Sequence, residues 1–209
     1  MSLFITFEGP EGSGKSTQIT PLADRLRALG HDVCLTREPG GTDIGDQIRQ
    51  VLHDLKNTAM QPRAEILLYS ASRAQLVGEI IRPHLERGGI VLCDRYADST
   101  MAYQGYGHGL DLGALRAITE FATGGLKPDL TILLDVETEE GLRRRRSSGE
   151  WNRLDAYALA FHQRVRQGYL GMAAAEPERW VVVDAGRAVE EVAEEVWRGV
   201  SKRLEGSRK

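Results

Sequence analysis

Five short runs of mainly apolar residues are spread along the chain, at residues 3–7, 32–36, 90–93, 130–134 and 180–183. Runs of this length and composition predict strands that are buried on both faces of a sheet. Between them, apolar residues recur at helical spacing. In residues 17–29 the stripe ends at Gly30, and Pro21 should cost this helix a backbone hydrogen bond.

The same spacing predicts further helices at residues 44–55, 64–85, 112–123, 138–146, 156–174 and 189–204. Residues 103–109 are rich in glycine and tyrosine and are expected to form a loop. Residues 147–155 are polar and are expected to be mobile, and residues 206–209 are expected to fray. Strands and helices therefore alternate along almost the whole chain.

Alternating strands and helices predict an α/β protein with a parallel sheet covered on both faces. The sequence shows no internal repeat and no linker, so we expect a single domain over residues 1–209. In such sheets ligands bind beyond the carboxyl ends of the strands. Polar residues follow the predicted strands at these ends: Glu8, Arg37, Asp94, Arg95, Asp135 and Asp184.

The composition excludes several other classes of protein. The 209 residues carry a formal net charge of −3, which argues against a general nucleic-acid binder. No run approaches the roughly 18 apolar residues that span a membrane, and the N-terminus lacks a signal-peptide pattern. Cys34 and Cys93 both lie in apolar runs, which indicates core residues of a reduced, cytoplasmic protein. No Cys/His cluster has the spacing of a zinc site.

A phosphate-binding pattern, G-x-x-x-x-G-K-[ST], is formed by Gly9, Gly14, Lys15 and Ser16 directly after the first strand. Its glycines let backbone N–H groups point at phosphate oxygens, and the following helix adds its positive N-terminal dipole. Lys15 is expected to reach the β- and γ-phosphates, and Ser16 to hold Mg²⁺. The motif predicts a nucleoside triphosphate site and the three-layer fold of P-loop NTPases, with about five parallel strands flanked by helices.

The arginines narrow the class of reaction. The Asn-Lys-x-Asp pattern that reads guanine in GTPase switches is absent. A kinase with a phosphorylated acceptor needs cations at two places and a lid that excludes water. Arginines occur in two such groups, at positions 37, 49, 73 and 95 and at positions 143–146 and 153. A solvated surface charge is the alternative for each of them, above all for Arg49.

Three stretches resemble the bacterial thymidylate kinase family: residues 8–17 (EGPEGSGKST), 36–42 (TREPGGT) and 94–99 (DRYADS). The resemblance covers residues 4 to about 196, and the second and third stretches are far more specific than the phosphate loop. It implies a homodimeric dTMP kinase that transfers the γ-phosphoryl of ATP to dTMP with Mg²⁺, giving dTDP and ADP for dTTP synthesis. The implied ATP site comprises Gly9, Pro10, Glu11, Gly12, Ser13, Gly14, Lys15, Ser16, Thr17 and, near adenine, Arg144.

The resemblance also implies how the base and sugar of dTMP are bound. Tyr69 would stack on the thymine ring. Arg73 and Thr100 would read the polar edge of the base, with Gln104 close to it. Tyr103 would pack near the sugar and disfavour a ribose 2′-hydroxyl.

The acceptor phosphate and the metal are assigned from the same resemblance. Arg95 would grip the phosphate, with Arg37 or Arg49 as a further contact. Glu11 would neighbour the acceptor sugar, and Asp94 would hold or orient Mg²⁺ through water.

A lid is expected at about residues 143–155. Some members of the family carry a catalytic arginine in the phosphate loop, but that neighbourhood here reads Glu11-Gly12. A lid arginine should then compensate, with Arg153 as the first choice and Arg146 as the second. Ser148 replaces an expected basic residue, and Arg143 and Arg145 are expected on a solvated helix face. The implied catalytic residues are Lys15, Arg95, Arg153 and Glu11.

Three alternatives remain open at this point. One is another nucleoside monophosphate kinase, acting on UMP, CMP or AMP. The second is a deoxynucleoside kinase, which would need a general base such as Glu8 or Glu11 to activate a sugar hydroxyl. The third is a regulator that binds ATP without turnover and needs no lid arginines.

Overall fold

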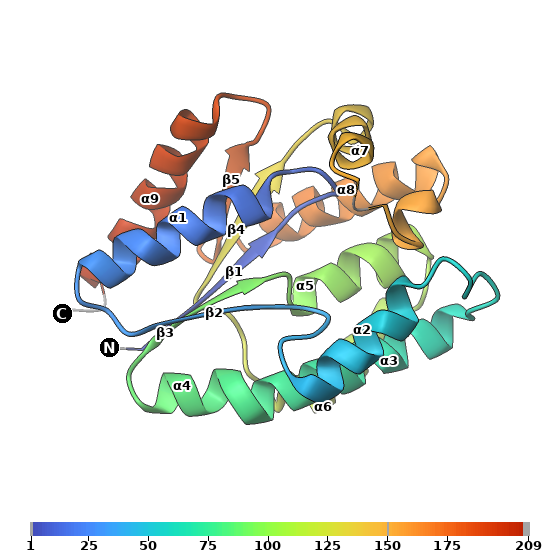
Figure 1. Ribbon diagram of the computed structural model, residues 1–209, viewed down its shortest axis with the longest axis horizontal. Coiled ribbons are helices and arrows are strands. Elements are labelled where there is room, and N and C mark those ends of the chain that lie inside the picture. The colour runs from blue at the N-terminus through green and yellow to red at the C-terminus, as the bar shows by residue number, and fades with distance from the viewer. Residues whose placement is uncertain (1, 150, 207–209) are drawn as a thin grey trace.

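The described residues of the computed structural model, 2–149 and 151–206, form one sheet of five parallel strands (Figure 1). The strands lie in the order β2-β3-β1-β4-β5, with β1 in the centre. Their bounds are β1 (Leu3–Glu8), β2 (Val33–Arg37), β3 (Ile90–Asp94), β4 (Leu130–Asp135) and β5 (Trp180–Asp184). The predicted strands and the α/β class are therefore confirmed.

Alternate residues of the central strand face opposite layers of helices. Leu3, Ile5 and Phe7 pack in a core cluster with α1 (Lys15–Ala28) and α9 (Val189–Gly206). Phe4 points the other way and packs with Leu76 of α3. Figure 1 shows α1 and α9 on one side of the sheet and α3 on the other. This alternation follows from the two-residue period of a strand.

The predicted helix at residues 64–85 is continuous but not uniform. It consists of α3 (Pro62–Leu76), a π-helical segment η1 (Val77–Ile81) and α4 (Arg82–Glu86). Pro83 lies in the first turn of α4 and has no N–H to donate to a preceding carbonyl. The widened segment comes directly before this proline, where regular α-helical bonding is interrupted.

The loop predicted at residues 103–109 is wrong for residues 103–107, and only His108 and Gly109 form a turn. Residues Ala97–Thr100 form α5, and Met101–Gly107 continue it as a π-helical segment, η2. Gly105 and Gly107 serve close packing instead of a turn. A Cβ on Gly107 would lie 2.6 Å from Cε2 of Phe161, and one on Gly105 would lie 2.5 Å from Cδ2 of Leu112.

The predicted lid segment contains more helix and more buried residues than its polar composition indicates. It begins with α7 (Thr138–Ser147) and ends with a short 3₁₀ helix, η3 (Leu154–Ala156). Arg153, Leu154 and Asp155 are all buried, so the second half of this polar segment is not solvated as its composition indicates. The next helix, α8 (Leu159–Ala175), begins three residues later than predicted because Tyr157 and Ala158 are extended.

Two further helices lie in the lower part of the view in Figure 1: α2 (Asp43–His53) and α6 (Leu112–Thr123). The side chain of Thr42 accepts a hydrogen bond from the Gly45 N–H and so caps α2 at its N-terminus. Of the helices described, none is long and apolar enough to cross a membrane. Gly206 ends α9, and the rest of the tail expected to fray, residues 207–209, lies outside the described part.

Candidate active site

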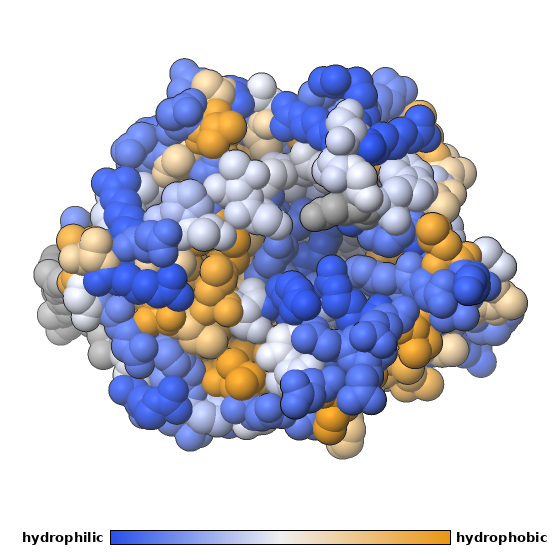
Figure 2. All heavy atoms as spheres, viewed as in Figure 1, coloured by the Kyte–Doolittle hydropathy of each residue, from blue (hydrophilic) through white to orange (hydrophobic). Residues whose placement is uncertain are grey.

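A cavity of about 820 Å³ lies at the carboxyl edge of the sheet. Figure 2 shows this face of the molecule hollowed near its middle and bordered largely by hydrophilic residues. Most of the predicted site residues line the cavity: Glu11, Gly12, Ser13, Gly14, Lys15, Ser16, Thr17, Arg37, Arg49, Tyr69, Arg73, Asp94, Arg95, Thr100, Tyr103, Gln104 and Arg144. Gly9, Pro10 and Arg153 are predicted residues that do not line it among those described.

The phosphate loop wraps around the Lys15 ammonium group. Lys15 Nζ donates to the carbonyl oxygens of Gly9 and Pro10, at 3.1 and 3.0 Å, and to Ser13 Oγ at 3.1 Å. Gly9 and Pro10 thus hold the Lys15 ammonium group through their carbonyl oxygens, although neither residue lines the cavity itself. Burial, followed by the charge of Arg95, lowers the Lys15 pKa to about 8. Gly12 has φ of +68°, and a Cβ there would clash with the backbone of Gly141 in α7.

Ser16 and Asp94 meet at the floor of the cavity although they are 78 residues apart in sequence. Ser16 Oγ donates to Asp94 Oδ2 at 3.2 Å. A hydroxyl and a carboxylate are hard oxygen ligands, and Mg²⁺ prefers a few such protein oxygens while keeping bound water and phosphate oxygens. The two side chains therefore fit a Mg²⁺ ion in the place where the motif predicts one.

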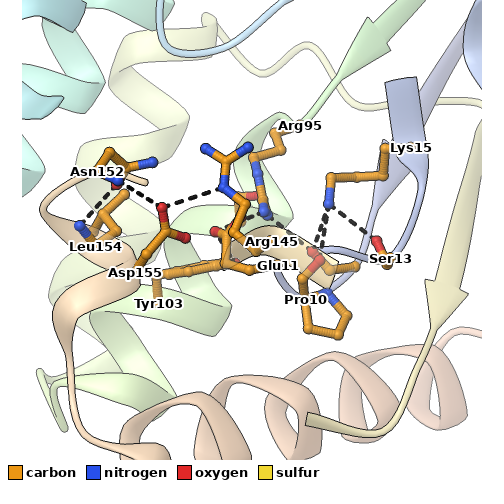
Figure 3. A network of polar contacts seen from close by, with 12 residues as sticks. Pro10, Glu11, Ser13, Lys15, Arg95, Tyr103, Arg145, Asn152, Leu154 and Asp155 are labelled. Atoms are coloured by element: carbon orange, nitrogen blue, oxygen red, sulfur yellow. Dashed lines mark hydrogen bonds and ion pairs between the residues drawn. The ribbon is translucent and has the colours of Figure 1, made fainter. Parts of the chain in front are cut away.

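Arg95 lies at the centre of the polar network drawn in Figure 3. Its Nη2 donates to Glu11 Oε1 at 2.9 Å, and its Nη1 donates to the Gly9 carbonyl at 3.0 Å. The Tyr103 hydroxyl donates to the same Glu11 oxygen at 2.8 Å. Burial opposes the ionisation of Glu11, but the charges of Arg95 and Lys15 outweigh it and lower the Glu11 pKa to about 2. Arg95 adopts φ of +68°, a left-handed conformation rare for this residue type.

A second carboxylate, Glu8, lies fully buried behind Arg95. Its Oε2 accepts hydrogen bonds from the hydroxyls of Ser99 and Tyr169, at 2.6 and 2.9 Å. Arg95 Nη1 donates to the same Tyr169 hydroxyl at 3.2 Å. Burial, followed by the charge of Asp98, raises the Glu8 pKa to about 7. Glu8 thus reaches Arg95 through hydroxyl groups and not by direct contact.

Arg73 projects from α3 into the pocket beside Tyr69, and it is 1% exposed. Its Nε donates to Glu38 Oε2 at 2.8 Å, its Nη2 to the Tyr96 carbonyl at 3.0 Å, and its Nη1 to Thr100 Oγ1 at 2.9 Å. The guanidinium is therefore fixed in one orientation by three separate acceptors. The ring of Tyr69 is half-buried at the wall of the same pocket.

Arg37 and Arg49 both line the cavity between the Pro39 loop and α2. Arg49 donates to the Pro39 carbonyl at 2.9 Å, and Arg37 forms an ion pair with Asp46 at 3.2 Å. His53, which the sequence analysis did not select, lies beside them at the end of α2. Burial, followed by the charge of Arg49, lowers the His53 pKa to about 4, so its imidazole is neutral at pH 7.

The arginines of α7 point in different directions. Arg143 is exposed, with a side chain 71% accessible, in agreement with the predicted solvated face. Arg144 donates to the Ala185 carbonyl at 2.9 Å and lines the cavity beside the loop that follows β5. The guanidinium of Arg146 lies 5.1 Å from the ring centre of Trp151, outside the lining of the main cavity.

Arg145 was expected on a solvated helix face, and that prediction is wrong. Its side chain is only 18% exposed, lines the cavity, and donates through Nε to Asp155 Oδ2 at 3.2 Å. Figure 3 shows Arg145 extended beside Arg95, near Glu11 and Asp155. Its positive charge contributes to the low pKa of Glu11. Arg145 thus brings a cation from the lid segment to the phosphate side of the cavity.

Arg153, the predicted lid arginine, points away from the cavity and is only 6% exposed. Its Nη2 lies 2.5 Å from Glu65 Oε2 in α3, its Nε donates to the Leu52 carbonyl, and its Nη1 donates to the Tyr157 hydroxyl. All three nitrogens of the guanidinium are therefore engaged within the protein. The geometry corrects the expectation that Arg153 faces the phosphates.

The residues missed by the sequence analysis are mostly anchors of the selected ones: Glu38, Glu65, Ser99, Asp155 and Tyr169. All of them except Asp155 lie far along the chain from at least one group that they hold, as Glu65 and Arg153 do at a separation of 88 residues. A carboxylate or a tyrosine in a helix carries no local signal of such a partner. Glu38 and Ser99 lie in two of the family stretches, but the partners of these residues could be found only from the folded structure.

A phosphate loop at the carboxyl edge of a parallel sheet, facing arginines from two regions of the chain, defines a P-loop phosphotransferase. The model of the thymidylate kinase family matches residues 7–196. Thymidylate kinase of Roseiflexus sp. (strain RS-1) is 60% identical, with 94% of this chain and 92% of the relative covered. That of Deinococcus radiodurans is 56% identical, with 96% and 97% covered.

A solved structure gives the same result. Thymidylate kinase from Ehrlichia chaffeensis superposes with a TM-score of 0.76 at 35% identity, and the match covers 94% of this chain and 97% of that one. The chain belongs to the thymidylate kinase family, and its function is that of a thymidylate kinase. The fold is accordingly that of the P-loop NTPases, as the phosphate loop predicts.

Proposed function

We propose that the transfer of the γ-phosphoryl group of ATP to dTMP takes place in the cavity at the carboxyl edge of the sheet. The observation that carries this proposal is the position of Arg95. Its guanidinium contacts the phosphate loop at Gly9 and lies in the same cavity as Arg73 and Tyr69. One cation is thus placed between the donor site and the acceptor pocket, where a transferring phosphoryl group must pass.

The donor triphosphate is assigned to the phosphate loop. The N–H groups of residues 11–17 and the N-terminus of α1 would bind its oxygens, and Lys15 would turn from the loop carbonyls to the β- and γ-phosphates. Adenine would lie near Arg144 and the loop after β5, where Ala185 and Arg187 line the cavity.

Mg²⁺ would be held by the Ser16 hydroxyl and by Asp94, directly or through water. When bound there, the ion neutralises charge that develops on the phosphate oxygens. The oxygen ligands found at this point of the cavity support the proposal.

The acceptor nucleotide is assigned to the pocket between α3 and η2. Tyr69 would stack on thymine, and Arg73 with Thr100 would face the polar edge of the base. Tyr103, held by Glu11, would pack against the sugar. Arg95 would bind the phosphate, with Arg37 and Arg49 close to it on the opposite wall.

We assign the lid cation that stabilises the transferring group to Arg145 instead of Arg153. Arg145 lines the cavity near Glu11, whereas Arg153 is buried against Glu65. The transition state of phosphoryl transfer spreads negative charge over the equatorial oxygens, and a correctly placed arginine can be worth about 10³-fold or more in rate. Asp155 would hold the Arg145 side chain extended toward that charge.

No general base is needed for this reaction. A phosphate monoester is largely ionised near neutral pH, since its second pKa is about 6. Glu11 is paired with Arg95, and Glu8 is buried behind it, so neither carboxylate is placed to remove a proton from an acceptor hydroxyl. Catalysis would consist of positioning and electrostatic stabilisation by Lys15, Arg95 and Arg145.

The proposal is tested by measuring ADP release from ATP and Mg²⁺ with dTMP, dUMP, UMP, CMP, AMP and thymidine side by side. Strong preference for dTMP supports the acceptor pocket. Preference for thymidine would contradict it, because a hydroxyl acceptor needs a base that the site does not supply. Replacing Mg²⁺ with EDTA should abolish turnover, and adding Mg²⁺ back should restore it.

We also propose that the protein is a cytoplasmic homodimer. Both cysteines are free thiols, which suits a reducing compartment. Phe121 of α6 is 91% exposed and Leu67 of α3 is 58% exposed, and such apolar side chains are suited to a subunit interface. Light scattering at micromolar concentration would reveal a mass of two chains, and a monomer would contradict the dimer.

A further inference from the structure

Glu65 is a buried carboxylate that touches several of the elements around the acceptor pocket. It lies in α3, is 1% exposed, and does not line the cavity among the described residues. Its Oε2 receives the Arg153 guanidinium from the lid segment. Its Oε1 accepts a hydrogen bond from Gln104 Nε2 in η2 at 2.7 Å, and the His108 ring nitrogen Nε2 lies 3.4 Å from the same oxygen.

The Glu65 carboxylate is ionised at neutral pH. Burial opposes its charge, but the nearby His108 ring and the hydrogen bonds from Gln104 and Arg153 outweigh burial and lower its pKa to about 2. An ionised carboxylate has no hydrogen to donate and accepts only. The Gln104 side chain can therefore approach Glu65 only with its amide nitrogen.

The same constraint fixes the direction of the Gln104 side-chain carbonyl oxygen. When Nε2 of Gln104 faces Glu65, the carbonyl oxygen Oε1 must lie on the opposite branch of the same planar group. Gln104 is 2% exposed and lines the cavity, and no donor within residues 2–149 and 151–206 is bonded to its Oε1. Because Gln104 lines the cavity, a ligand that donates a hydrogen bond to Oε1 would take the place of water there.

We infer that Glu65 determines base specificity by holding the Gln104 amide with its oxygen toward the acceptor base, so that the pocket selects a base with a ring N–H. The inference rests on the proposed placement of the base between Tyr69, Arg73 and Gln104. Thymine offers the N3–H donor beside a carbonyl oxygen. The N3 atom of cytosine carries no hydrogen and is an acceptor. In this pocket it would face the Gln104 oxygen, which is also an acceptor, so no hydrogen bond could form between them.

Arg73 and Thr100, on the opposite side of the pocket from Gln104, complement the polar groups of thymine. Arg73 and Thr100 are hydrogen-bonding groups held together at 2.9 Å, and the guanidinium offers only donors. The pocket therefore presents donors on one side and a fixed acceptor on the other, which matches a carbonyl next to an N–H. Glu65 would act on this choice without contacting the nucleotide, as a positioning residue.

The test uses Glu65→Gln, which keeps the size of the side chain and lets the Gln104 amide adopt either orientation. The ratio of kcat/KM for dTMP to kcat/KM for dCMP should fall about 10- to 100-fold, while KM for ATP stays within about twofold. Both acceptors are measured on one preparation, so any loss of folded enzyme cancels in the ratio. Glu120→Gln, the same change on the exposed face of α6, serves as the matched control and should leave the ratio unchanged.

A double-mutant cycle with Gln104→Met separates this role from a structural one. If Glu65 acts through Gln104, adding Glu65→Gln to Gln104→Met should change the dTMP-to-dCMP ratio no further. The same loss in both backgrounds, or an unchanged ratio in Glu65→Gln, would overturn the inference. A wild-type enzyme with no preference for dTMP over dCMP would instead refute the proposed acceptor site.

Glu65→Gln leaves Arg153 without its buried counter-charge, which can prevent folding. The double variant Glu65→Gln/Arg153→Met removes both charges and keeps the test available. Its dTMP-to-dCMP ratio should fall as in the single variant, and a wild-type ratio would overturn the inference.

Discussion

The guanidinium of Arg95 lies 2.9 Å from the carboxylate of Glu11, and the two residues follow neighbouring strands of the sheet. Glu11 comes from the phosphate loop after β1, and Arg95 comes directly after β3. Parallel pairing of β1 with β3 brings both strand ends to the same edge. The pair therefore joins the phosphate loop to the segment that follows β3.

Arg95→Lys tests this junction. Lysine keeps the positive charge but cannot contact Glu11, Gly9 and the acceptor phosphate together, because it lacks the planar fork of arginine. We expect kcat/KM for dTMP to fall about 100-fold or more and KM for ATP to change by less than about threefold. Steady-state kinetics with each substrate varied in turn measures both. Equal losses for the two substrates would contradict a role at the acceptor phosphate.

Arg145→Ala and Arg143→Ala form a matched pair within one turn of α7, on roughly opposite faces of the helix. Arg145 faces the cavity, whereas Arg143 is exposed and pairs with Glu140. The first substitution should lower kcat about 100-fold or more, and the second should leave kcat within about twofold. Single-turnover measurements with saturating ATP and dTMP would compare the chemical step directly. A larger loss in Arg143→Ala would refute the assignment.

Arg153→Met should act chiefly on stability. The substitution leaves the Glu65 carboxylate buried without its counter-charge, and breaking a buried pair costs about 3–5 kcal/mol. Urea unfolding monitored by circular dichroism should show this loss. Arg146→Met, at a side chain outside the main cavity, is the control and should cost less than about 1 kcal/mol. A wild-type free energy of unfolding for Arg153→Met would contradict the buried contact.

Glu8 should make stability depend on pH. Its pKa is raised from 4.5 to about 7 by burial and by Asp98, so the folded state holds a proton that the unfolded state releases. Stability from this group is therefore present below about pH 4.5 and is lost as pH rises through about 7. Relative to Glu8→Gln, the wild type should lose on the order of 1–3 kcal/mol between pH 5 and pH 8. Parallel pH profiles for the two proteins would argue against it.

Two glycine substitutions test the packing of η2 against α8. A Cβ on Gly107 would lie 2.6 Å from Phe161, so Gly107→Ala should destabilise the protein by about 1–3 kcal/mol. Gly171 lies within α8 with no atom within 4 Å of the added Cβ, so Gly171→Ala should stabilise it by about 0.5–1 kcal/mol. Thermal unfolding of the two variants checks the opposite signs.

Much of the fold follows from local sequence. The strand runs, the helical stripes and the phosphate loop are short-range patterns, and the elements that they predict are present with bounds shifted by up to three residues, as at the start of α8. The grouping of Lys15, Asp94 and Arg95 at one edge also follows, because residues after parallel strands must meet there. Three motifs sufficed to indicate the family.

Contacts between distant residues decided the rest. Arg145 and Arg153 lie eight positions apart in one polar segment, and no local pattern shows which of them faces the cavity. Asp155 holds Arg145 at the cavity, while Glu65, 88 residues from Arg153, draws that arginine into the protein. The glycines of η2 likewise serve as contact surfaces for Phe161 and Leu112. Burial and charge pairing operate between side chains in space, so only the tertiary structure could assign these roles.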